Sequence, residues 1–330
     1  MLRRTLKLIA GTLLVITVAA LATAPGQLDH VAPVPDVGAE PAVWIAANEA
    51  RVDEATPILP GAEKRIRWYA DRENSRTDYS VVYLHGFSAT RQEVAPVGEM
   101  IADALAANLF ETRLTGHGLI DDPLSGVRAE SWLDDGVEAL AIGAAIGDRI
   151  VLIGTSTGAT LAVALADHDA FTDVASLVMI SPNFAVRDPS SEALTWPGGP
   201  QLARLMVGET HSWTAANDQQ ELYWSTTYPT AALVEMMRLV KRARGLLPLE
   251  LEQPLLTLYS PNDGVVDTEW LLRAVAQMRS PRADTIAIEQ SGDPSNHVLA
   301  GDILAPDNNA EIADHVVRFV GAPERRSFEP

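Results

Sequence analysis

Short apolar runs alternate with longer stretches of helical periodicity along most of this chain. Runs typical of strands cover residues 66–70, 79–84, 109–113, 150–153, 176–180, 255–259 and 285–289. Helical periodicity covers residues 43–55, 93–107, 132–146, 159–167, 268–278 and 310–320, and Ser131 is expected to cap the third of these helices. Ile150–Ile153 and Leu177–Ile180 are apolar at every position, as strands buried on both faces of a parallel sheet require. The pattern therefore predicts an α/β fold with a doubly wound, mainly parallel sheet.

The alternation of strands and helices is interrupted at residues 187–252. A segment of this length is too long for a loop in a compact domain. We interpret it as an inserted, partly helical cap over the carboxyl ends of the strands, where open α/β sheets bind their ligands. The core of the fold is then expected at residues 64–186 and 253–320, followed by a C-terminal tail at 321–330.

The first 28 residues have the composition of an export or membrane segment. Three basic residues among the first seven precede an uncharged apolar run that continues from Leu8 to Leu28. Read as a signal peptide, the segment contains the small-residue cleavage site Ala20-Leu21-Ala22. Read as an anchor, it would form about 32 Å of helix, enough to span a bilayer. Both alternatives predict an exported protein, either periplasmic, secreted or membrane-anchored. Residues 29–63, with several prolines, are expected to form a linker and an N-terminal extension.

Charge and composition exclude several kinds of function. The chain carries 25 basic and 44 acidic residues, and its net charge of −19 opposes binding to nucleic acid. It contains no cysteine, so disulfides, thiolate catalysis and cysteine-ligated metals are excluded. His, Asp and Glu residues do not form a group with the spacing of metal ligands, and we expect neither a metal nor another cofactor.

The motif Gly154-Thr155-Ser156-Thr157-Gly158 lies between a predicted buried strand and a predicted helix. A serine between two glycines on a strand-to-helix turn is the pattern of a nucleophile elbow. The turn must be sharp for the hydroxyl to project from the sheet, and side chains at positions 154 and 158 would collide with the neighbouring helix and strand. A plain glycine-rich turn is the alternative, but the flanking strand and helix favour Ser156 as a nucleophile.

A serine nucleophile needs a general base to remove its proton. Four histidines follow Ser156 in the chain: His168, His211, His297 and His315. His168 and His315 are expected on helices, and His211 falls in the predicted cap, where it is a solvated residue or a substrate contact. His297 lies in the loop between the last predicted strand and the last predicted helix, and we predict that it is the base.

The base in turn needs an acid that orients its ring and stabilises its cation. Asp263 follows the predicted strand 255–259 in the turn Ser260-Pro261-Asn262-Asp263-Gly264, from which a carboxylate can reach a neighbouring strand-end loop. A purely turn-forming Asp-Gly is the alternative role. Asp267 is the rival candidate, but its position just before a predicted helix suits an N-terminal cap better. The sequence favours Asp263 as the acid.

A tetrahedral intermediate carries an oxyanion that needs two backbone N–H donors. Thr157, the residue after the nucleophile, is expected to provide one of them. The loop His85-Gly86-Phe87, which follows the predicted strand 79–84, is expected to provide the other through the N–H of Phe87. Gly86 allows the backbone to turn there, and His85 is then a structural residue rather than the base.

With these residues assembled, the chain resembles the α/β-hydrolase superfamily, in the branch of serine carboxylesterases, monoacylglycerol-lipase-like enzymes and related serine aminopeptidases. The resemblance covers residues 64–320, and its motifs are Val82-Tyr83-Leu84-His85-Gly86-Phe87, Arg113-Leu114-Thr115-Gly116-His117-Gly118, Gly154-Thr155-Ser156-Thr157-Gly158, Tyr259-Ser260-Pro261-Asn262-Asp263 and Ser295-Asn296-His297. It implies an α/β-hydrolase fold with a cap, a Ser-Asp-His order of the triad along the chain, and a structural role for His117. The threonines beside the nucleophile depart from the more varied residues that are common there, and the cap contains no matching motif.

The resemblance implies a serine hydrolase that cleaves small-molecule carboxylic esters through an acyl-enzyme. The predicted cap is rich in aromatic residues, and Trp196, Trp213 and Trp224 are candidates for an acyl-binding groove, although packing of the cap on the sheet would use them equally well. Lipid-like or acylglycerol substrates are weakly favoured, and the N-terminal segment allows association with a membrane. A peptidase, thioesterase or acyltransferase could use the same triad, and a non-catalytic binding protein could use the same scaffold.

Overall fold

The computed structural model describes residues 26, 28 and 31–321, and a seven-stranded sheet lies at its centre. The strands are β1 (Arg65–Arg67), β2 (Ser80–Leu84), β3 (Asn108–Glu111), β4 (Ile150–Thr155), β5 (Val174–Ile180), β9 (Leu255–Tyr259) and β11 (Ala283–Ala287). Their order across the sheet is β1-β3-β2-β4-β5-β9-β11. β1 is antiparallel to β3, and the other neighbours pair in parallel. The predicted mainly parallel, doubly wound sheet is confirmed.

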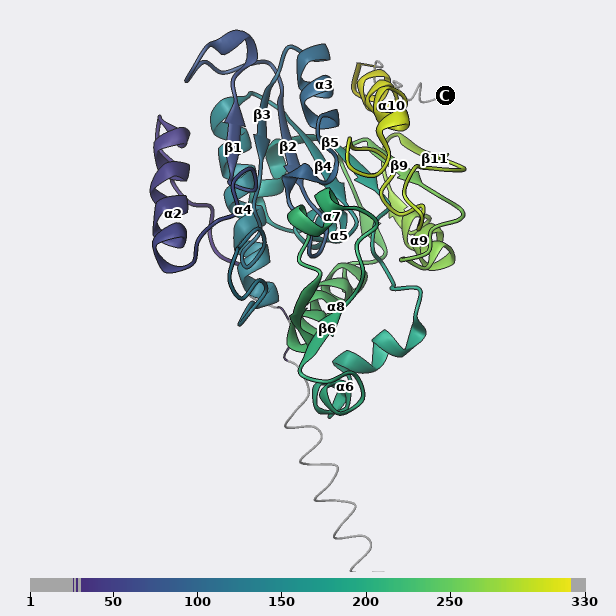
Figure 1. Ribbon diagram of the computed structural model, residues 1–330. Coiled ribbons are helices and arrows are strands. Elements are labelled where there is room, and N and C mark those ends of the chain that lie inside the picture. Colours follow the sequence, from purple (N-terminus) through teal and green to yellow (C-terminus); the bar gives the residue numbers. More distant parts are fainter. Residues whose placement is uncertain (1–25, 27, 29–30, 322–330) are drawn as a thin grey trace, which may run out of the picture.

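Helices cover both faces of this sheet (Figure 1). α3 (Val97–Ala104) and α10 (Asn309–Gly321) pack on one face. α4 (Ala129–Ile146), α5 (Thr157–Ala164), α8 (Thr230–Gly245) and α9 (Thr268–Val275) pack on the other. Because side chains alternate along a strand, Val81 and Tyr83 of β2 face the first layer, whereas Val82 and Leu84 face the second. The central strands are therefore apolar at nearly every position.

Two predicted helix starts are wrong, and both have a local cause. The helix expected at 93–107 begins only at Val97, because Pro96 lacks a backbone N–H and disfavours helical geometry in the preceding residue. Residues 91–93 form the 3₁₀ turn η2 (Arg91–Glu93) instead. Ser131 does not cap α4, which begins at Ala129 after Arg128. The N–H of Ala129 donates to the Glu235 carboxylate of α8, so a long-range contact replaces the expected local cap.

The other predicted elements are present, with ends that differ by a few residues. The helix expected at 43–55 is α2 (Pro41–Ala55), and the strand expected at 66–70 is the short β1 followed by the 3₁₀ turn η1 (Tyr69–Asp71). Two more 3₁₀ turns, η3 (Asp169–Asp173) and η5 (Pro306–Asn308), precede β5 and α10.

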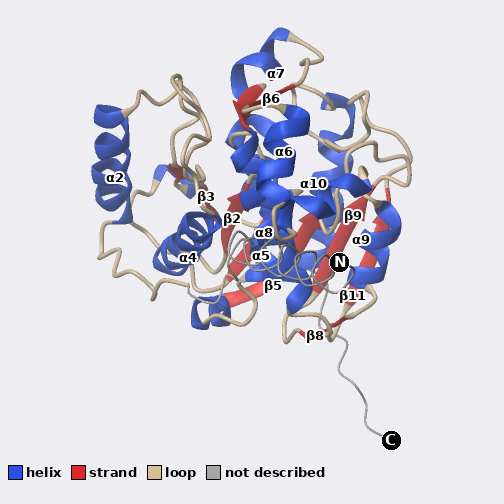
Figure 2. Ribbon diagram, turned by 90° about the horizontal axis from the view of Figure 1, so that it is seen from below, coloured by secondary structure: helices blue, strands red, loops and turns tan. Residues whose placement is uncertain are grey.

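The insertion after β5 contains η4 (Pro189–Thr195), α6 (Gly199–Val207), β6 (Thr210–Ser212), α7 (Asp218–Tyr223) and β7 (Thr227–Pro229). β6 and β7 pair as a small antiparallel ribbon, and α6 lies at the bottom of Figure 1, far from α3 and α10. Figure 2 looks onto this side of the molecule from below, with α6 near the centre of the view and α7 and β6 at its top.

Residues 230–252, predicted as part of the cap, belong to the core instead. Met237, Val240 and Ala243 of α8 are buried in the main core cluster beside α5. The short strand β8 (Leu249–Glu250) then pairs in parallel with β10 (Met278–Arg279). An amphipathic helix has the same periodicity in a cap as in a core layer, so the pattern alone did not separate α8 from the insertion.

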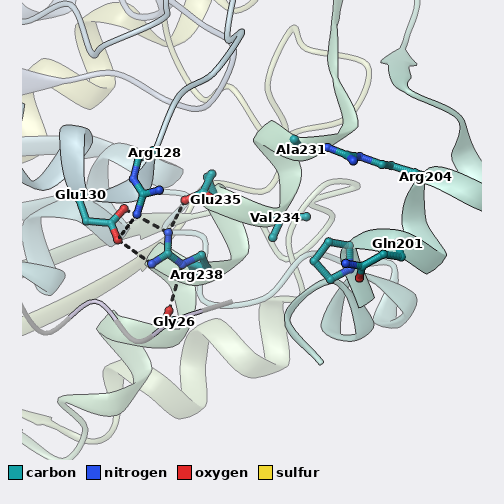
Figure 3. Close-up of a pocket in the computed structure, with 10 residues that line it drawn as sticks. Gly26, Arg128, Glu130, Gln201, Arg204, Ala231, Val234, Glu235 and Arg238 are labelled. Carbon is teal, nitrogen blue, oxygen red and sulfur yellow. Dashed lines mark hydrogen bonds and ion pairs between the residues drawn. The ribbon is translucent and has the colours of Figure 1, made fainter. Parts of the chain in front are cut away.

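The segment predicted as a signal peptide or anchor, residues 1–28, lies outside the described residues apart from Gly26 and Leu28. Those two residues lie along α8: Arg238 Nε donates to the Gly26 carbonyl at 3.1 Å, and Arg242 Nη1 donates to the Leu28 carbonyl at 2.6 Å. Arg238 also pairs with Glu130 and Glu235 (Figure 3).

The predicted linker also packs against the core where it is described, since Val37 is buried in the main core cluster together with Leu28. Helix α2 follows it and buries Ile45 in the same cluster. Among the helices within the described residues, none is both long and apolar enough to cross a membrane.

Candidate active site

Ser156 lies on a strained turn between β4 and α5. Its φ of 52° and ψ of −116° are outside the regions that a serine ordinarily adopts. A Cβ at Gly154 would lie 2.5 Å from the nitrogen of Ala159, and a Cβ at Gly158 would lie 2.1 Å from the carbonyl oxygen of Leu84. The two glycines are therefore required by the neighbouring helix and strand, as the sequence predicted.

The three residues predicted as a triad form one hydrogen-bonded chain. Ser156 Oγ lies 2.9 Å from Nε2 of His297, and Nδ1 of His297 lies 2.8 Å from Oδ2 of Asp263. Asp263 Oδ1 accepts the backbone N–H groups of Val265 and Val266 at 2.7 and 2.9 Å. Since a carboxylate can only accept, the proton of neutral His297 lies on Nδ1, and Nε2 can receive the proton of the serine.

Asp267, the rival acid, caps α9. Its Oδ1 accepts the backbone N–H of Trp270 at 2.9 Å, as expected for a residue just before a helix. The remaining histidines after Ser156 also lie elsewhere: His168 caps η3, His211 lies in β6, and His315 lies within α10. The geometry therefore pairs His297 with Asp263 alone among these candidates.

Opposing effects act on the pKa of His297. Burial lowers the pKa of the imidazole, but the charge of Asp263 and its hydrogen bond raise it, and the nearby Glu93 and Asp293 carboxylates add to this effect. The net result is a pKa above the ordinary value of a histidine. The cation that forms when His297 accepts a proton is therefore stabilised by its surroundings.

The N–H groups of Phe87 and Thr157 occupy the ends of adjacent strands. Phe87 follows β2 and Thr157 follows β4, which pairs with β2. β3 is added on one side of β2 along the sheet and β4 on the other, so the order of the strands reverses direction between β2 and β4. Ligands bind at such a switch point in open α/β sheets. In the part of the chain that the structure describes, neither N–H donates to a protein acceptor. Both donors are thus available for an oxyanion.

His85 has the structural position that the sequence predicted. Its Nε2 accepts the N–H of Leu114 at 3.0 Å, so its proton lies on Nδ1, which donates to the Gly86 carbonyl at 2.9 Å. Burial lowers the pKa of His85 to about 4, and the ring is therefore neutral near pH 7. His117 is also buried, and its ring packs against those of Phe87 and Trp132.

Two buried acids near His297 were missed by sequence reasoning. Asp293 Oδ2 accepts the backbone N–H groups of His297 and Val298, both at 2.9 Å, and so shapes the loop that carries the base. An Asp beside Pro294 in a polar loop is a turn signal that could have identified it. Glu93 contacts the Gly86 loop and gave no comparable signal.

The aromatic residues of the insertion divide between the site and the surface. Trp213 and Trp224 pack near Ala89 and Val298, which flank the loops of Phe87 and His297. Trp196 is 59% exposed. Tyr228 meets the Phe87 ring edge-on at 5.2 Å between ring centroids. Ser225 N–H also donates to the Ser88 carbonyl at 2.7 Å, so the cap contacts the loop of Phe87 directly.

Across residues 26, 28 and 31–321, acidic and histidine side chains do not gather into a group that could hold a metal ion.

Comparison with known proteins agrees with this arrangement. The sequence pattern of the Alpha/beta hydrolase family matches residues 81–317, which include all five residues of the site. The chain belongs to the alpha/beta hydrolase family. Within it, the chain is 30% identical over 215 residues to a thermostable monoacylglycerol lipase from Bacillus sp. (strain H-257), covering 65% of this chain and 80% of that protein.

Solved structures share the fold of this hydrolase. One comes from work on LipS and LipT, two metagenome-derived lipolytic enzymes; it matches with a TM-score of 0.65 and 22% identity over 80% of this chain and 98% of that chain. Another is a monoacylglycerol lipase from Paleococcus ferrophilus, with a TM-score of 0.55 and 14% identity over 78% and 97% of the two chains. The predicted α/β-hydrolase fold is confirmed.

Substitution of Gly158 tests the packing that forms the elbow. Gly158→Ala should destabilise this hydrolase by about 3 kcal/mol or more, because its Cβ would overlap backbone rather than a movable side chain. Gly245→Ala is the matched control, since no atom lies within 4 Å of a Cβ at that position. Urea unfolding of the two variants measures the difference. Equal midpoints would contradict the close approach of α5 and β2.

Proposed function

We propose that this chain is a serine hydrolase that cleaves carboxylic esters with Ser156, His297 and Asp263. The observation that carries the proposal is the hydrogen-bonded chain from Ser156 Oγ through His297 to the buried Asp263, which begins at a strained elbow. Membership of the alpha/beta hydrolase family and the similarity to lipases and esterases support the same chemistry.

In the proposed mechanism, Ser156 Oγ attacks the acyl carbon while His297 Nε2 takes the hydroxyl proton. The carbonyl oxygen becomes an oxyanion, which accepts hydrogen bonds from the N–H groups of Phe87 and Thr157. The carbon–oxygen bond to the alcohol then breaks, and His297 gives its proton to the departing alkoxide. Water repeats these steps on the acyl-enzyme, with His297 again as the base, and releases the carboxylic acid.

We further propose acyl esters of the acylglycerol type as substrates. The similarity to a monoacylglycerol lipase supports this class, as does the apolar cluster of Trp213, Trp224 and Val298 beside the base. The insertion also has an apolar surface: Leu202, Leu205 and Met206 lie on one side of α6 and are 48%, 83% and 76% exposed. Exposed apolar patches of this kind are typical of surfaces that contact lipid or protein.

Export and contact with a membrane through the N-terminal segment remain part of the proposal. The basic start and apolar run of residues 1–28 support it. Gly26 lies in a pocket that is also lined by Gln201 and Arg204 of α6 (Figure 3). Gly26 therefore lies beside α6, the helix that also carries the exposed Leu202, Leu205 and Met206.

Replacement of Ser156 tests the nucleophile. Ser156→Ala should lower kcat roughly 10⁶-fold, because the acyl-enzyme cannot form. Turnover of p-nitrophenyl esters of increasing acyl length and of a monoacylglycerol measures the loss, and a fluorophosphonate probe should label the unaltered protein but not the variant. Ser212→Ala, an exposed serine in β6, is the control. Labelling that persists in Ser156→Ala would identify another serine as the nucleophile.

Paired amide substitutions test the acid. Asp263→Asn should reduce kcat by about 10⁴-fold with the fold intact, because an amide favours the wrong tautomer of the imidazole. Asp267→Asn should keep its activity and lose at most about 1 kcal/mol of stability from its cap. A dead Asp267→Asn enzyme beside an active Asp263→Asn enzyme would assign the acid to the other residue.

The pH dependence of kcat/KM in the Asp263→Asn and Asp267→Asn variants is a second test of which residue is the acid. His297 must be neutral to act as a base, and its pKa is raised, so kcat/KM of the unaltered enzyme should decline as the pH falls through a value above the ordinary histidine pKa of about 6.5. Asp263→Asn removes the strongest raising effect and leaves that of burial. The acid limb of its residual activity should therefore move to lower pH, whereas that of Asp267→Asn should not move.

The N-terminus of the protein made in its native host tests export. Cleavage after Ala22 should yield a protein that begins at Thr23, as read by N-terminal sequencing of the exported fraction. An intact chain that sediments with membranes would favour the anchor instead. Soluble protein that retains residue 1 in the cytoplasm would contradict both alternatives.

A further inference from the structure

The carboxyl group of Glu93 is buried behind the loop that carries Phe87. The residue is 2% exposed, and its Oε2 accepts both the backbone N–H of Gly86 at 2.7 Å and the hydroxyl of Tyr83 at 2.8 Å. Burial raises the pKa of Glu93, and these two hydrogen bonds oppose that effect. An acid in such a place costs stability unless its hydrogen bonds are retained. Its side chain plays no part in the proposed proton transfers.

Glu93 lies between two loops of the site. A Cβ at Gly86 would lie 2.6 Å from Glu93 Oε1, so only a glycine lets the carboxyl approach the backbone here. On the other side, a Cβ at Gly301 would lie 2.3 Å from the backbone carbonyl of Glu93. Gly301 belongs to the segment that follows His297. The turn η2 thus packs tightly against the segments that carry the oxyanion donor and the base.

The hydrogen bonds around Gly86 fix the direction of the Phe87 N–H. The N–H of Gly86 is held by Glu93, and its carbonyl accepts from His85 Nδ1 at 2.9 Å and from the N–H of Ala89 at 3.3 Å. In a trans peptide the carbonyl of Gly86 and the N–H of Phe87 point in opposite directions. The carbonyl contacts hold the Gly86–Phe87 peptide itself, and Glu93 holds the preceding His85–Gly86 peptide. With both peptides held, the Phe87 N–H keeps one orientation before a substrate arrives.

We propose that Glu93 is a positioning residue: by fixing the His85–Gly86 peptide through its N–H, it keeps the next peptide, Gly86–Phe87, in the orientation an oxyanion hole requires. This inference rests on the proposed function, because it assigns Glu93 to the oxyanion donor of that site. Donors that are fixed in advance stabilise a developing charge without reorganisation, and this is their main contribution to catalysis. The role depends on a hydrogen-bond acceptor at this position, and a neutral amide oxygen can supply one.

The test compares Glu93→Ala with Glu93→Gln. Glu93→Ala should lower kcat roughly 10- to 100-fold, part of the effect of deleting an oxyanion donor, while KM for a p-nitrophenyl ester stays unchanged. Its Ki for phenylboronic acid, which forms a tetrahedral adduct with the serine, should rise by the same factor as kcat falls. Glu93→Gln keeps an acceptor for the Gly86 N–H and should retain most of the activity and of the boronate affinity.

Glu111→Ala is the matched control, because Glu111 is also a buried acid (3% exposed) but pairs with Arg65 and Arg91. Activities are expressed per serine labelled by fluorophosphonate, so that unfolded protein is not counted. The control should lose stability but keep kcat and the boronate Ki. If Glu93→Ala does not fold, Glu93→Asp, which withdraws the carboxylate by one methylene, replaces it with the same expected loss.

Two results would overturn the inference. In the first, Glu93→Ala loses stability while kcat per labelled serine and the boronate Ki are those of the unaltered protein. In the second, Glu93→Gln is as impaired as Glu93→Ala, which would show that the charge matters and the acceptor does not. Both leave the proposed function standing. An unaltered protein that neither hydrolyses esters nor reacts with fluorophosphonate would overturn the proposed function and this inference together.

Discussion

The close approach of helix α5 to the end of strand β2 is the constraint on which the site depends. At Gly158 the helix is so near the carbonyl of Leu84 that no side chain fits between them. This contact brings the start of α5 close to the end of β2, the strand that the Phe87 loop follows. The same packing holds Ser156 in a backbone conformation that few residues adopt. The packing of α5 on the buried sheet thus stabilises the fold enough to keep the strained backbone conformation of Ser156.

Three buried acids lie near His297 and raise its pKa, and each accepts at least one backbone N–H group. Asp263 accepts those of Val265 and Val266, Asp293 accepts that of His297 itself, and Glu93 accepts that of Gly86. Backbone donors offset much of the cost of burying a carboxyl without bringing a cation that would repel the imidazolium. The arrangement favours positive charge at the base, while within the described residues the N–H groups of Phe87 and Thr157 donate to no protein acceptor.

Sequence reasoning predicted those parts of the site that depend on the order of strands, loops and helices along the chain. Ser156, Asp263 and His297 each follow a predicted strand, and the ends of parallel strands meet at one edge of the sheet. Pro96 shows the limit of a periodic pattern, because one missing N–H shortened a helix that the apolar spacing favoured.

Features that depend on distant residues were not predictable in this way. Arg238 and Arg242 hold Gly26 and Leu28 across 212 and 214 residues, and no local pattern marks such a pairing. The contact of Glu93 with Gly86 spans only seven residues, but it depends on the turn η2, which Pro96 separates from the helix. The insertion ends before α8 because that helix buries its apolar face on α5. Packing against α5 determines this position, and the apolar periodicity of α8 does not predict it.

Under the proposed mechanism, contact between the insertion and the Phe87 loop connects substrate binding to catalysis. Tyr228 packs on the Phe87 ring, and Ser225 donates to the carbonyl of Ser88, so cap residues touch the loop that carries the proposed oxyanion donor. In that mechanism, a change in the cap acts on the transition state as well as on binding, because it alters the position of the proposed donor, which forms its hydrogen bond only as charge develops. Glu93 contacts the same loop through the Gly86 N–H, so the proposed Phe87 donor lies between a contact with the buried core and contacts with the cap.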